Sequence, residues 1–328
     1  MFVNYIDNQG KTKLQKFIDA IADSINRGDY KLGDPLPSVN NVSKKYQVSR
    51  DTVFKAYSEL KRRGLIDSTP AKGYFVADSN NKVFLFLDAF SPFKDVLYNS
   101  LIKSLPHNYK VDLGFHHYNL RVFETVVLDS IGRYNFFLIM NFNNEKISNV
   151  LRKLDSAKLL ILDWGKYKHE KFSYVCQDFG EEAYHCFKEA APRIKKYRKF
   201  NYVCPKGCFH PEITWDYFQK FCKEEKIEYR QIKNLDSDFF NCGESYLVFR
   251  QSDLVQILKI AKEKKLKIGE DMGIIAYNDT PLYEVIEGGI TSISTNFRLM
   301  GEKAAEFVIS RQKKQEIIKT SLIVRNSL

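Results

Sequence analysis

The side chains whose type and spacing could support chemistry gather in one short segment. Cys204 and Cys208 form a C-x-x-x-C pair, and His210 lies close by. Thiolates and imidazoles are zinc ligands, but a closed zinc site needs a fourth ligand, and no second Cys or His pair follows at zinc-finger spacing. We therefore expect no metal site, and we interpret all six cysteines as reduced structural thiols.

Other groupings that signal catalysis are missing from the sequence. We find no glycine-rich phosphate loop, no paired carboxylates placed for acid–base work, and no Ser, His and Asp grouping for nucleophilic attack. The expectation is a protein that binds its partners rather than converting them, and that uses no cofactor.

Length and composition indicate an ordinary globular protein. At 328 residues the chain is long enough for two domains, with 44% hydrophobic and 28% charged residues. No apolar run approaches the roughly 20 residues of a membrane span, and residues 1–7 lack the basic and apolar regions of a secretory signal. Together with reduced cysteines, this predicts a cytoplasmic protein.

The formal net charge of +11 favours a polyanionic partner without proving one. Residues 1–80 contain 13 Lys and Arg against 9 Asp and Glu, a net charge of +4, so +7 of the +11 lies in the remainder. A case for nucleic-acid binding must therefore depend on where particular residues lie.

The amino-terminal pattern predicts three helices and a hairpin. Residues 11–28 carry apolar side chains at helical spacing, and Gly28 ends this helix. Ser38 can cap a short second helix, and a break at Gln47-Val48 separates it from a third helix over 50–63, which Gly64 stops. Strands over 65–68 and 73–76 complete a winged helix-turn-helix over residues 1–77. The expected buried side chains are Leu14, Phe17, Ile18, Ile21, Ala22, Ile25, Val39, Val42, Tyr46, Val53, Ala56, Tyr57 and Leu60.

A different pattern begins after a polar linker over residues 78–82. Short apolar runs alternate with helical segments, as expected for parallel strands covered by helices on both faces. The predicted strands are 83–88, 109–115, 136–141 and 158–163, then 173–177, 199–204, 227–232, 245–250 and 272–277. Helices are predicted to end at 104, 133 and 154 and to begin at 181, 212 and 253. Two such series over residues 83–328 predict an α/β domain with two Rossmann-like lobes and a cleft between them.

The amino-terminal segments resemble the GntR family of bacterial repressors over about residues 10–77. The resemblance is carried by Gly33-Asp34-Pro35-Leu36-Pro37-Ser38, Tyr46-Gln47-Val48-Ser49-Arg50-Asp51-Thr52-Val53, Ala56-Tyr57-Ser58-Glu59-Leu60 and Gly73-Tyr74-Phe75-Val76. It implies binding to double-stranded DNA, with the polar start of the third helix in the major groove.

This resemblance assigns DNA-contacting roles to individual residues. Arg50 can bind a guanine edge or a phosphate, and Ser49 and Thr52 can donate to phosphates. Asn40 and Phe54 replace arginines that are common in the family, so its usual operator is not transferred here. The expected DNA-binding residues are Ser38, Asn40, Ser49, Arg50, Asp51, Thr52, Lys55, Lys72 and Gly73. Further phosphate contacts, or simply a solvated helix face, are Lys44, Lys45, Lys61, Arg62 and Arg63.

The carboxy-terminal segment resembles the LacI-type effector domain, which is itself similar to periplasmic sugar-binding proteins. Over residues 245–328 the resemblance is carried by Gly273-Ile274-Ile275-Ala276-Tyr277-Asn278-Asp279 and by Asn296-Phe297-Arg298-Leu299-Met300-Gly301. Over 83–244 it extends only to the architecture. It implies a sugar held between two lobes by planar polar side chains and an aromatic face.

The same resemblance nominates an effector site. Asn278 takes the position of an effector-binding aspartate, and Phe297 that of a stacking aromatic residue. Alternatively, Phe297 packs in the core and Asn278 caps a turn, while Trp164 either lines the cleft or packs a hinge. The full set of expected effector-binding residues is Phe93, Asn143, Asp178, His210, Arg250, Ser252, Asn278 and Phe297.

We therefore expect a homodimeric regulator, a repressor of carbohydrate-utilisation genes. It would bind a palindromic operator, with an affinity that a monosaccharide or phosphosugar changes. Two alternatives remain at this point. One is a GntR-type reader fused to an enzyme domain that binds pyridoxal phosphate, which needs a longer chain and a Schiff-base lysine. The other is an activator that responds to a ligand other than a sugar.

Overall fold

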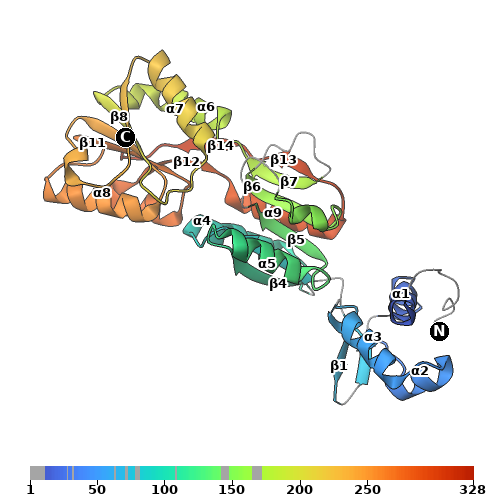
Figure 1. Ribbon diagram of the computed structural model, residues 1–328. Coiled ribbons are helices and arrows are strands. Elements are labelled where there is room, and N and C mark those ends of the chain that lie inside the picture. Colours follow the sequence, from blue (N-terminus) through green and yellow to red (C-terminus); the bar gives the residue numbers. More distant parts are fainter. Residues whose placement is uncertain are drawn as a thin grey trace. The chain divides into compact units, whose positions relative to one another are not determined.

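The computed structural model contains an amino-terminal helical domain and two larger sheets (Figure 1). Two compact units divide the chain: β1–β5 belong to one, and most of β6 together with β7–β14 and α4 to the other. The structure describes residues 12–27, 29–31, 33–62, 64–70, 73–77, 82–107, 109–141, 148–164 and 172–328.

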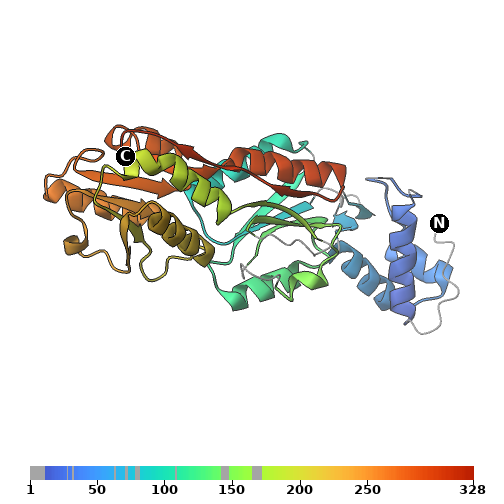
Figure 2. The same ribbon diagram turned by 90° about the horizontal axis from the view of Figure 1, so that it is seen from above.

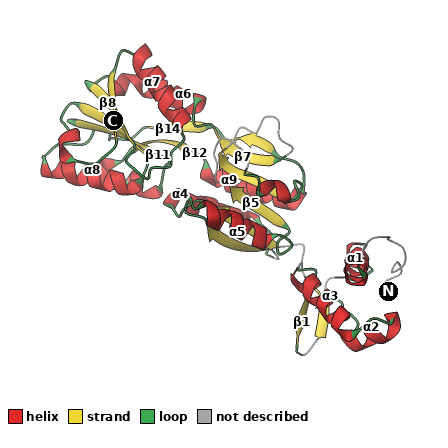
Figure 3. Ribbon diagram, viewed as in Figure 1, coloured by secondary structure: helices red, strands yellow, loops and turns green. Residues whose placement is uncertain are grey.

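The amino-terminal elements form the predicted winged helix-turn-helix (Figure 3). Helices α1 (Lys13–Asn26), α2 (Val39–Tyr46) and α3 (Arg50–Arg62) precede an antiparallel hairpin of β1 (Ile66–Thr69) and β2 (Gly73–Val76). All thirteen side chains expected to face inward belong to one hydrophobic cluster or pack against it. The helical spacing therefore located this core correctly, because one apolar face per helix is enough to build it.

The chain just before α2 is tied to the hairpin. The amides of Gly33 and Leu36 donate to the carbonyls of Val76 (3.0 Å) and Tyr74 (2.8 Å), so this segment runs beside β2. The hydroxyl of the buried Tyr57, on α3, donates to the Pro37 carbonyl at 2.7 Å. These bonds fix the start of α2 against both the wing and α3.

The first of the two larger sheets has the described strand order β13-β7-β6-β5-β3-β4. Its strands pair in parallel wherever a register is given. The strands are β3 (Lys82–Leu87), β4 (Lys110–Phe115), β5 (Phe136–Met140), β6 (Leu159–Trp164), β7 (Ser173–Gln177) and β13 (Gln315–Ile317). Its helices are α4 (Pro92–Ser104) and α5 (Leu120–Ser130).

The second sheet has the described order β14-β12-β11-β10-β8-β9, parallel except for β14. Helices α6 and α7 cover one face and α8 the other, with a separate hydrophobic cluster on each side (Figure 1). The strands are β8 (Lys199–Val203), β9 (Glu228–Ile232), β10 (Glu244–Val248), β11 (Met272–Tyr277), β12 (Thr291–Thr295) and β14 (Thr320–Ile323), and the helices are α6 (Glu181–Ile194), α7 (Glu212–Glu224) and α8 (Gln251–Glu263). The two sheets confirm the expected α/β architecture with two Rossmann-like lobes.

Some expectations differ from the structure. The helix predicted to end at 154 appears, within the described residues, only as a 3-10 turn at Leu151–Lys153, after residues 142–147 that lie outside the description. Most of the predicted linker also lies outside it, and Lys82 already belongs to β3. Near the carboxyl end, α9 (Phe297–Ser310) lies beside α4, and β13 pairs with β7 of the first sheet (Figure 2). No described helix is long and apolar enough to cross a membrane.

Candidate DNA-binding surface and ligand site

The start of α3 is organised by its own hydroxyl groups. Ser49 Oγ accepts the Thr52 amide at 3.1 Å and lies 2.7 Å from Thr52 Oγ1, so it caps the helix. Because one of these two hydroxyl hydrogens is used in their mutual bond, the other is left to donate outward. The capping role and the predicted phosphate contact are therefore compatible.

Arg50 is the exposed first residue of α3, and within the described chain no ion pair involves it. One residue further on, Asp51 forms an ion pair with Lys55 at 2.8 Å, with both side chains mostly exposed. Exposed pairs contribute little to stability and exchange readily for other partners, so Lys55 can still reach a phosphate. The polar start of α3 thus presents a free guanidinium and a loosely held ammonium group.

The remaining predicted DNA contacts divide into three groups. Ser38 caps α2 by accepting the Asn41 amide at 3.2 Å, and Asn40 is exposed on that helix. Gly73 begins β2 with φ +67°, a conformation that favours glycine, and a Cβ there would meet nothing within 4 Å. Lys61 pairs with Asp67 and also donates to Ser68 Oγ, both at 2.9 Å, so it joins α3 to β1, and these two contacts favour a structural role more than the exposed ion pair of Lys55 does. The exposed lysines 44 and 45 stay predictions, whereas Lys72, Arg63 and the Arg62 side chain lie outside the description.

The second candidate site is marked by buried polar atoms at strand ends. Gln177 Oε1, Tyr277 Oη and Asn278 Oδ1 are buried, and none has a hydrogen-bond partner among the described residues. Thr280 Oγ1, two residues beyond Asn278, is likewise buried without a hydrogen-bond partner among the described residues. A buried polar group without a partner costs about 1–3 kcal/mol, so four of them following β7 and β11 require an explanation. A ligand that supplies the missing partners is one.

Backbone strain occurs at the same strand ends. Asp163 near the end of β6 has φ +69°, and Asn278 directly after β11 has φ +66°. Left-handed conformations are uncommon for residues other than glycine and accumulate where a binding site needs a particular geometry. Asp163 also accepts a hydrogen bond from Gln177 Nε2 at 2.6 Å, which leaves the Gln177 carbonyl oxygen for another donor.

An aromatic cluster lines this region. The His210 ring stacks on Phe249 with centroids 3.9 Å apart and meets Tyr277 edge-on at 4.5 Å. Phe179 lies 6.0 Å from Tyr277 and 5.8 Å from Trp164. Trp164 therefore packs within this group, in agreement with the packing alternative. Apolar ring faces beside unpartnered polar atoms are what a sugar ring requires.

His210 is held as a neutral donor. Thr214 uses its hydroxyl hydrogen on the Phe179 carbonyl at 2.7 Å, so its oxygen accepts from His210 Nε2 at 2.9 Å. The other ring nitrogen is then left as an acceptor. Burial lowers the pKa of His210 well below its usual value, which keeps the imidazole uncharged near neutral pH.

Phe93 and Phe297, both predicted effector residues, come together as ring neighbours 4.7 Å apart. They line an open groove of about 390 Å³ with Thr280 and with Ser294 at the end of β12. Phe297 is itself only 4% exposed, so its role as a core residue and its role as a groove wall coexist. The groove brings two of the nominated aromatics to one place.

Other nominated residues have structural partners. Asp178 Oδ1 accepts the amides of Gly180 (2.8 Å) and Glu181 (3.2 Å) and so holds the turn that leads into α6. Arg250 makes two hydrogen bonds of 2.8 Å to Asp253, and the exposed Ser252 also donates to that carboxylate. Asn143 lies outside the described residues.

Sequence reasoning missed polar groups in the first compact unit. Tyr118 donates to Asp88 at 2.7 Å, beyond the ends of β4 and β3, and His116 is fully buried beside them. His117 and Tyr118 have φ of +48° and +56°. The signal was available, because Asp88, Gln177 and Tyr277 are the last residues of predicted strands, and residues 116–118 come directly after another.

Family models match both parts of the chain. One described as "Bacterial regulatory proteins, gntR family" matches residues 14–76, and one described as "Periplasmic binding protein-like domain" matches residues 194–328. The uncharacterized HTH-type transcriptional regulator YcxD of Bacillus subtilis is 37% identical over 70 residues, which are 21% of this chain and 16% of that protein. The likeness to this relative is therefore confined to one domain.

Solved structures match the larger part. The trehalose repressor of Escherichia coli superimposes with a TM-score of 0.62 at 14% identity, over 75% of this chain and 100% of that one. A periplasmic binding protein/LacI transcriptional regulator of Alkaliphilus metalliredigens, complexed with D-xylulofuranose, gives 0.61 at 13%, over 75% and 98%. At these identities the likeness is one of fold. The amino-terminal segment thus matches the gntR-family model, residues 194–328 match the periplasmic-binding-protein-like model, and the larger part of the chain shares the fold of these regulators.

Proposed function

We propose that this protein is a transcriptional regulator, a repressor of carbohydrate-utilisation genes, whose operator affinity is changed by a bound monosaccharide or phosphosugar. It binds DNA through α3, with Arg50 at the major groove and the wing at Gly73 beside the backbone. The proposal places the protein in the cytoplasm with its DNA, and it assigns no catalytic step to the chain.

One observation carries the ligand part of the proposal. Gln177, Tyr277, Asn278 and Thr280 have buried oxygen atoms without partners in the described chain, and Tyr277 among them meets the His210 ring at 4.5 Å. Hydroxyl-rich ligands satisfy such atoms, and a sugar's C–H face packs on aromatic rings. The complex of the Alkaliphilus regulator with D-xylulofuranose and the name of the trehalose repressor support a sugar as the ligand class.

The regulatory step requires different affinities in two states. A sugar shifts operator binding only if it binds the DNA-competent and DNA-incompetent arrangements unequally. A homodimer on a palindromic operator provides two such states, since small changes in each subunit alter the spacing of two DNA-binding domains.

Three exposed apolar side chains support contact with a second copy of the chain: Ile102 (40% exposed), Leu282 (47%) and Val285 (74%). Sedimentation of the full chain tests the dimer, and a monomer at micromolar concentration would contradict it.

The decisive experiment has two stages. Operator DNA is first selected from a random library with the full chain, and the selected site is then titrated by band shift in the presence of pentoses, hexoses and their phosphates. A parallel thermal-shift screen finds any sugar that raises the melting temperature by binding the folded state. We expect at least one sugar to do both. If no sugar changes either quantity, the sugar-sensing part is wrong, while sequence-selective DNA binding stands on its own.

The enzyme alternative has less support. The fold over the larger part of the chain is shared with the trehalose repressor, and the relative YcxD covers only the DNA-binding domain of this chain. An activator that responds to another ligand would pass the first stage of the experiment and fail the sugar titration, which separates it from the proposal.

A further inference from the structure

The six cysteines occupy different environments. Cys176, Cys186 and Cys222 are buried, and burial raises the pKa of the thiols of Cys186 and Cys222 to about 12, so these groups stay protonated. Cys242 is exposed and lies alone in a turn. Cys204 and Cys208 are both partly exposed, and both lie in the loop between β8 and α7.

A tight turn brings these two thiols together. The Cys208 amide donates to the Pro205 carbonyl at 2.9 Å, and Gly207 adopts φ +82°, as the third residue of such a turn requires. Cys204 Sγ donates to the Cys208 carbonyl oxygen at 3.9 Å, so the Cys204 side chain lies against the backbone of Cys208. The loop thus holds the two cysteines as neighbours across a four-residue turn.

The charges around the pair distinguish the two sulfurs. The hydrogen bond from Cys208 lowers the pKa of the Cys204 thiol. The nearby cations of Arg250 and Lys233 lower this pKa further, and the Asp253 carboxylate raises it. The same hydrogen bond and burial raise the pKa of Cys208. Arg250 lies close to the turn, since a Cβ on Gly207 would be 3.7 Å from its Nη1. Cys204 is therefore the better nucleophile of the pair.

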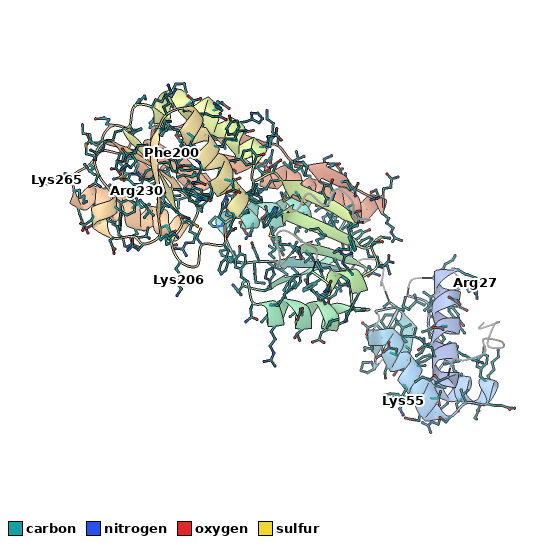
Figure 4. All side chains as sticks on the ribbon, turned by 45° about the horizontal axis from the view of Figure 1, so that its top comes forward. Arg27, Lys55, Phe200, Lys206, Arg230 and Lys265 are labelled. Atoms are coloured by element: carbon teal, nitrogen blue, oxygen red, sulfur yellow. The ribbon has the colours of Figure 1, made fainter. Side chains whose placement is uncertain are left out.

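The pair is also open to small molecules. Lys206, between the two cysteines, is exposed, and its side chain points away from the domain (Figure 4). Among the described residues, no group of three or more His, Cys, Asp or Glu is arranged to hold a metal ion.

We propose that Cys204 and Cys208 form a reversible dithiol–disulfide pair that exchanges with low-molecular-weight disulfides. The Cys204 thiolate attacks one sulfur of the small disulfide, and its S–S bond breaks to release one small thiol, which takes up the proton from Cys204. The Cys208 thiolate then attacks Cys204 Sγ in the mixed disulfide and displaces the second small thiol, which takes up the proton from Cys208. In sum, two protein thiols are oxidised to one disulfide, and one small disulfide is reduced to two thiols.

The pair is connected to the candidate ligand site through the short loop that carries it. His210 lies two residues after Cys208, and its ring stacks on Phe249 at 3.9 Å. Closing the disulfide restrains the backbone of Cys208, and this restraint lies two residues from the stacked ring. We therefore expect oxidation to shift His210 and to change sugar affinity, a consequence that depends on the proposed function.

The first test needs no ligand. The full chain is incubated with glutathione disulfide, alkylated and mapped by peptide mass spectrometry. We expect the native protein to lose two hydrogen atoms and to contain a Cys204–Cys208 link that dithiothreitol reverses. Cys242→Ser is the matched control, because it removes an exposed thiol and should leave the link unchanged. Glutathione retained on both Cys204 and Cys208, or no modification of either, would overturn the proposal.

Single variants establish the order of events. Cys208→Ser should hold one glutathione on Cys204 as a stable mixed disulfide, whereas Cys204→Ser should react at least several-fold more slowly at Cys208. Circular dichroism in the far ultraviolet confirms that both variants fold. Equal reactivity of the two single variants would contradict Cys204 as the attacking thiol.

The coupling to His210 is measured separately. Near-ultraviolet circular dichroism reports the packing of the aromatic cluster without any ligand, and it should change on oxidation of the native chain but not of Cys204→Ser. An unchanged spectrum would remove the coupling. The thermal-shift screen with sugars is then repeated on reduced and oxidised protein. If no sugar binds in either form, the proposed function fails, while the disulfide pair stands on the peptide map.

Discussion

The two candidate sites treat their polar groups in opposite ways. At the start of α3, Ser49 with Thr52 and Asp51 with Lys55 satisfy one another on an exposed surface. At the ends of β7 and β11, Gln177 and Tyr277 have buried oxygen atoms without partners in the described chain. The polar groups of a DNA-binding surface are hydrated when no DNA is bound, so the folded protein loses little stability in the absence of DNA. A ligand site that excludes water keeps a desolvation cost that only its ligand removes.

This comparison makes a general prediction about substitutions. Changes at the DNA-binding surface should alter binding and leave stability nearly unchanged. Changes at the ligand site should alter both, sometimes in opposite directions.

Phe297→Ala should have the largest effect, because it removes a ring that is 4% exposed and packs on Phe93 at 4.7 Å. We expect unfolding free energy to fall by about 3 kcal/mol, as for other buried Phe-to-Ala changes, together with loss of the sugar response. Chemical denaturation and sugar titration measure the two quantities. Operator binding should persist in the folded variant, and its loss together with the sugar response would assign Phe297 to the core alone.

Arg50→Ala should weaken operator binding by roughly 1–3 kcal/mol if Arg50 contacts a base. Its melting temperature should not change, since the side chain is exposed. Arg27→Ala is the matched control: it removes the same charge from the same domain, from an exposed residue just after α1 (Figure 4). Equal losses of affinity for the two variants would reduce the role of Arg50 to general charge.

Acidification should destabilise the ligand-binding domain through His210. Burial lowers the pKa of His210 in the folded state below its ordinary 6.5, so the unfolded chain binds one more proton as the pH falls below that value. Stability is therefore retained above 6.5 and lost below it, by up to about 1.4 kcal/mol per pH unit until the folded-state pKa is reached. Melting temperatures of the native chain and of His210→Gln, compared from about pH 7 to pH 5, isolate this contribution. Parallel curves for the two proteins would contradict it.

Tyr277→Phe sharpens the comparison most directly. It removes a buried hydroxyl that has no partner in the described chain, so we expect unchanged or higher stability, by up to about 1 kcal/mol, with weaker sugar binding. Tyr246→Phe is the matched control, because the Tyr246 hydroxyl is buried and hydrogen-bonded to Glu244 at 3.1 Å and to the Asn241 amide at 2.8 Å. That variant should lose stability instead. A stability loss for Tyr277→Phe equal to that of Tyr246→Phe would mean that its hydroxyl is already satisfied.

Asp51→Ala should have the smallest effect. It frees Lys55 from an ion pair between side chains that are 70% and 62% exposed, and such pairs contribute a few tenths of a kcal/mol. Binding to random DNA should strengthen slightly as one negative charge is removed, with a salt dependence as steep as or steeper than that of the native chain. Band shifts at several salt concentrations measure this. A selective loss of operator binding would show instead that Asp51 itself contacts a base.

The amino-terminal domain was largely predictable because its information is local. Side chains such as Phe17 and Val53 mark helix faces by spacing alone, and Ser38 and Ser49 cap helices as their positions suggest. The parallel strands were equally readable as apolar runs. The pairing of β13 with β7 was not, because it joins residues more than a hundred positions apart.

The ligand site was less predictable for a different reason. The resemblance nominated Asn278 and His210, whereas Tyr277 and Gln177 were identified because packing buries one oxygen atom of each without a partner among the described residues, and burial is a tertiary property. The resemblance also nominated Asp178 for the ligand, a prediction that stays open, and the structure shows its carboxylate accepting the amides of Gly180 and Glu181. A polar residue after a strand can serve either purpose, and only the surrounding contacts distinguish the two.

The hydrogen bonds that join the segment before α2 to β2 have a mechanical consequence. A load transmitted along the backbone from the following residues enters the amino-terminal domain through β2, because β2 is the last element of that domain. Because Gly33 and Leu36 are bonded to this strand, that load is passed to the segment in front of Ser38, the residue that caps α2. The strand thus transmits tension through these hydrogen bonds to the start of α2, in the helix pair that is proposed to bind DNA. The tension need not pass through the hydrophobic core to reach α2.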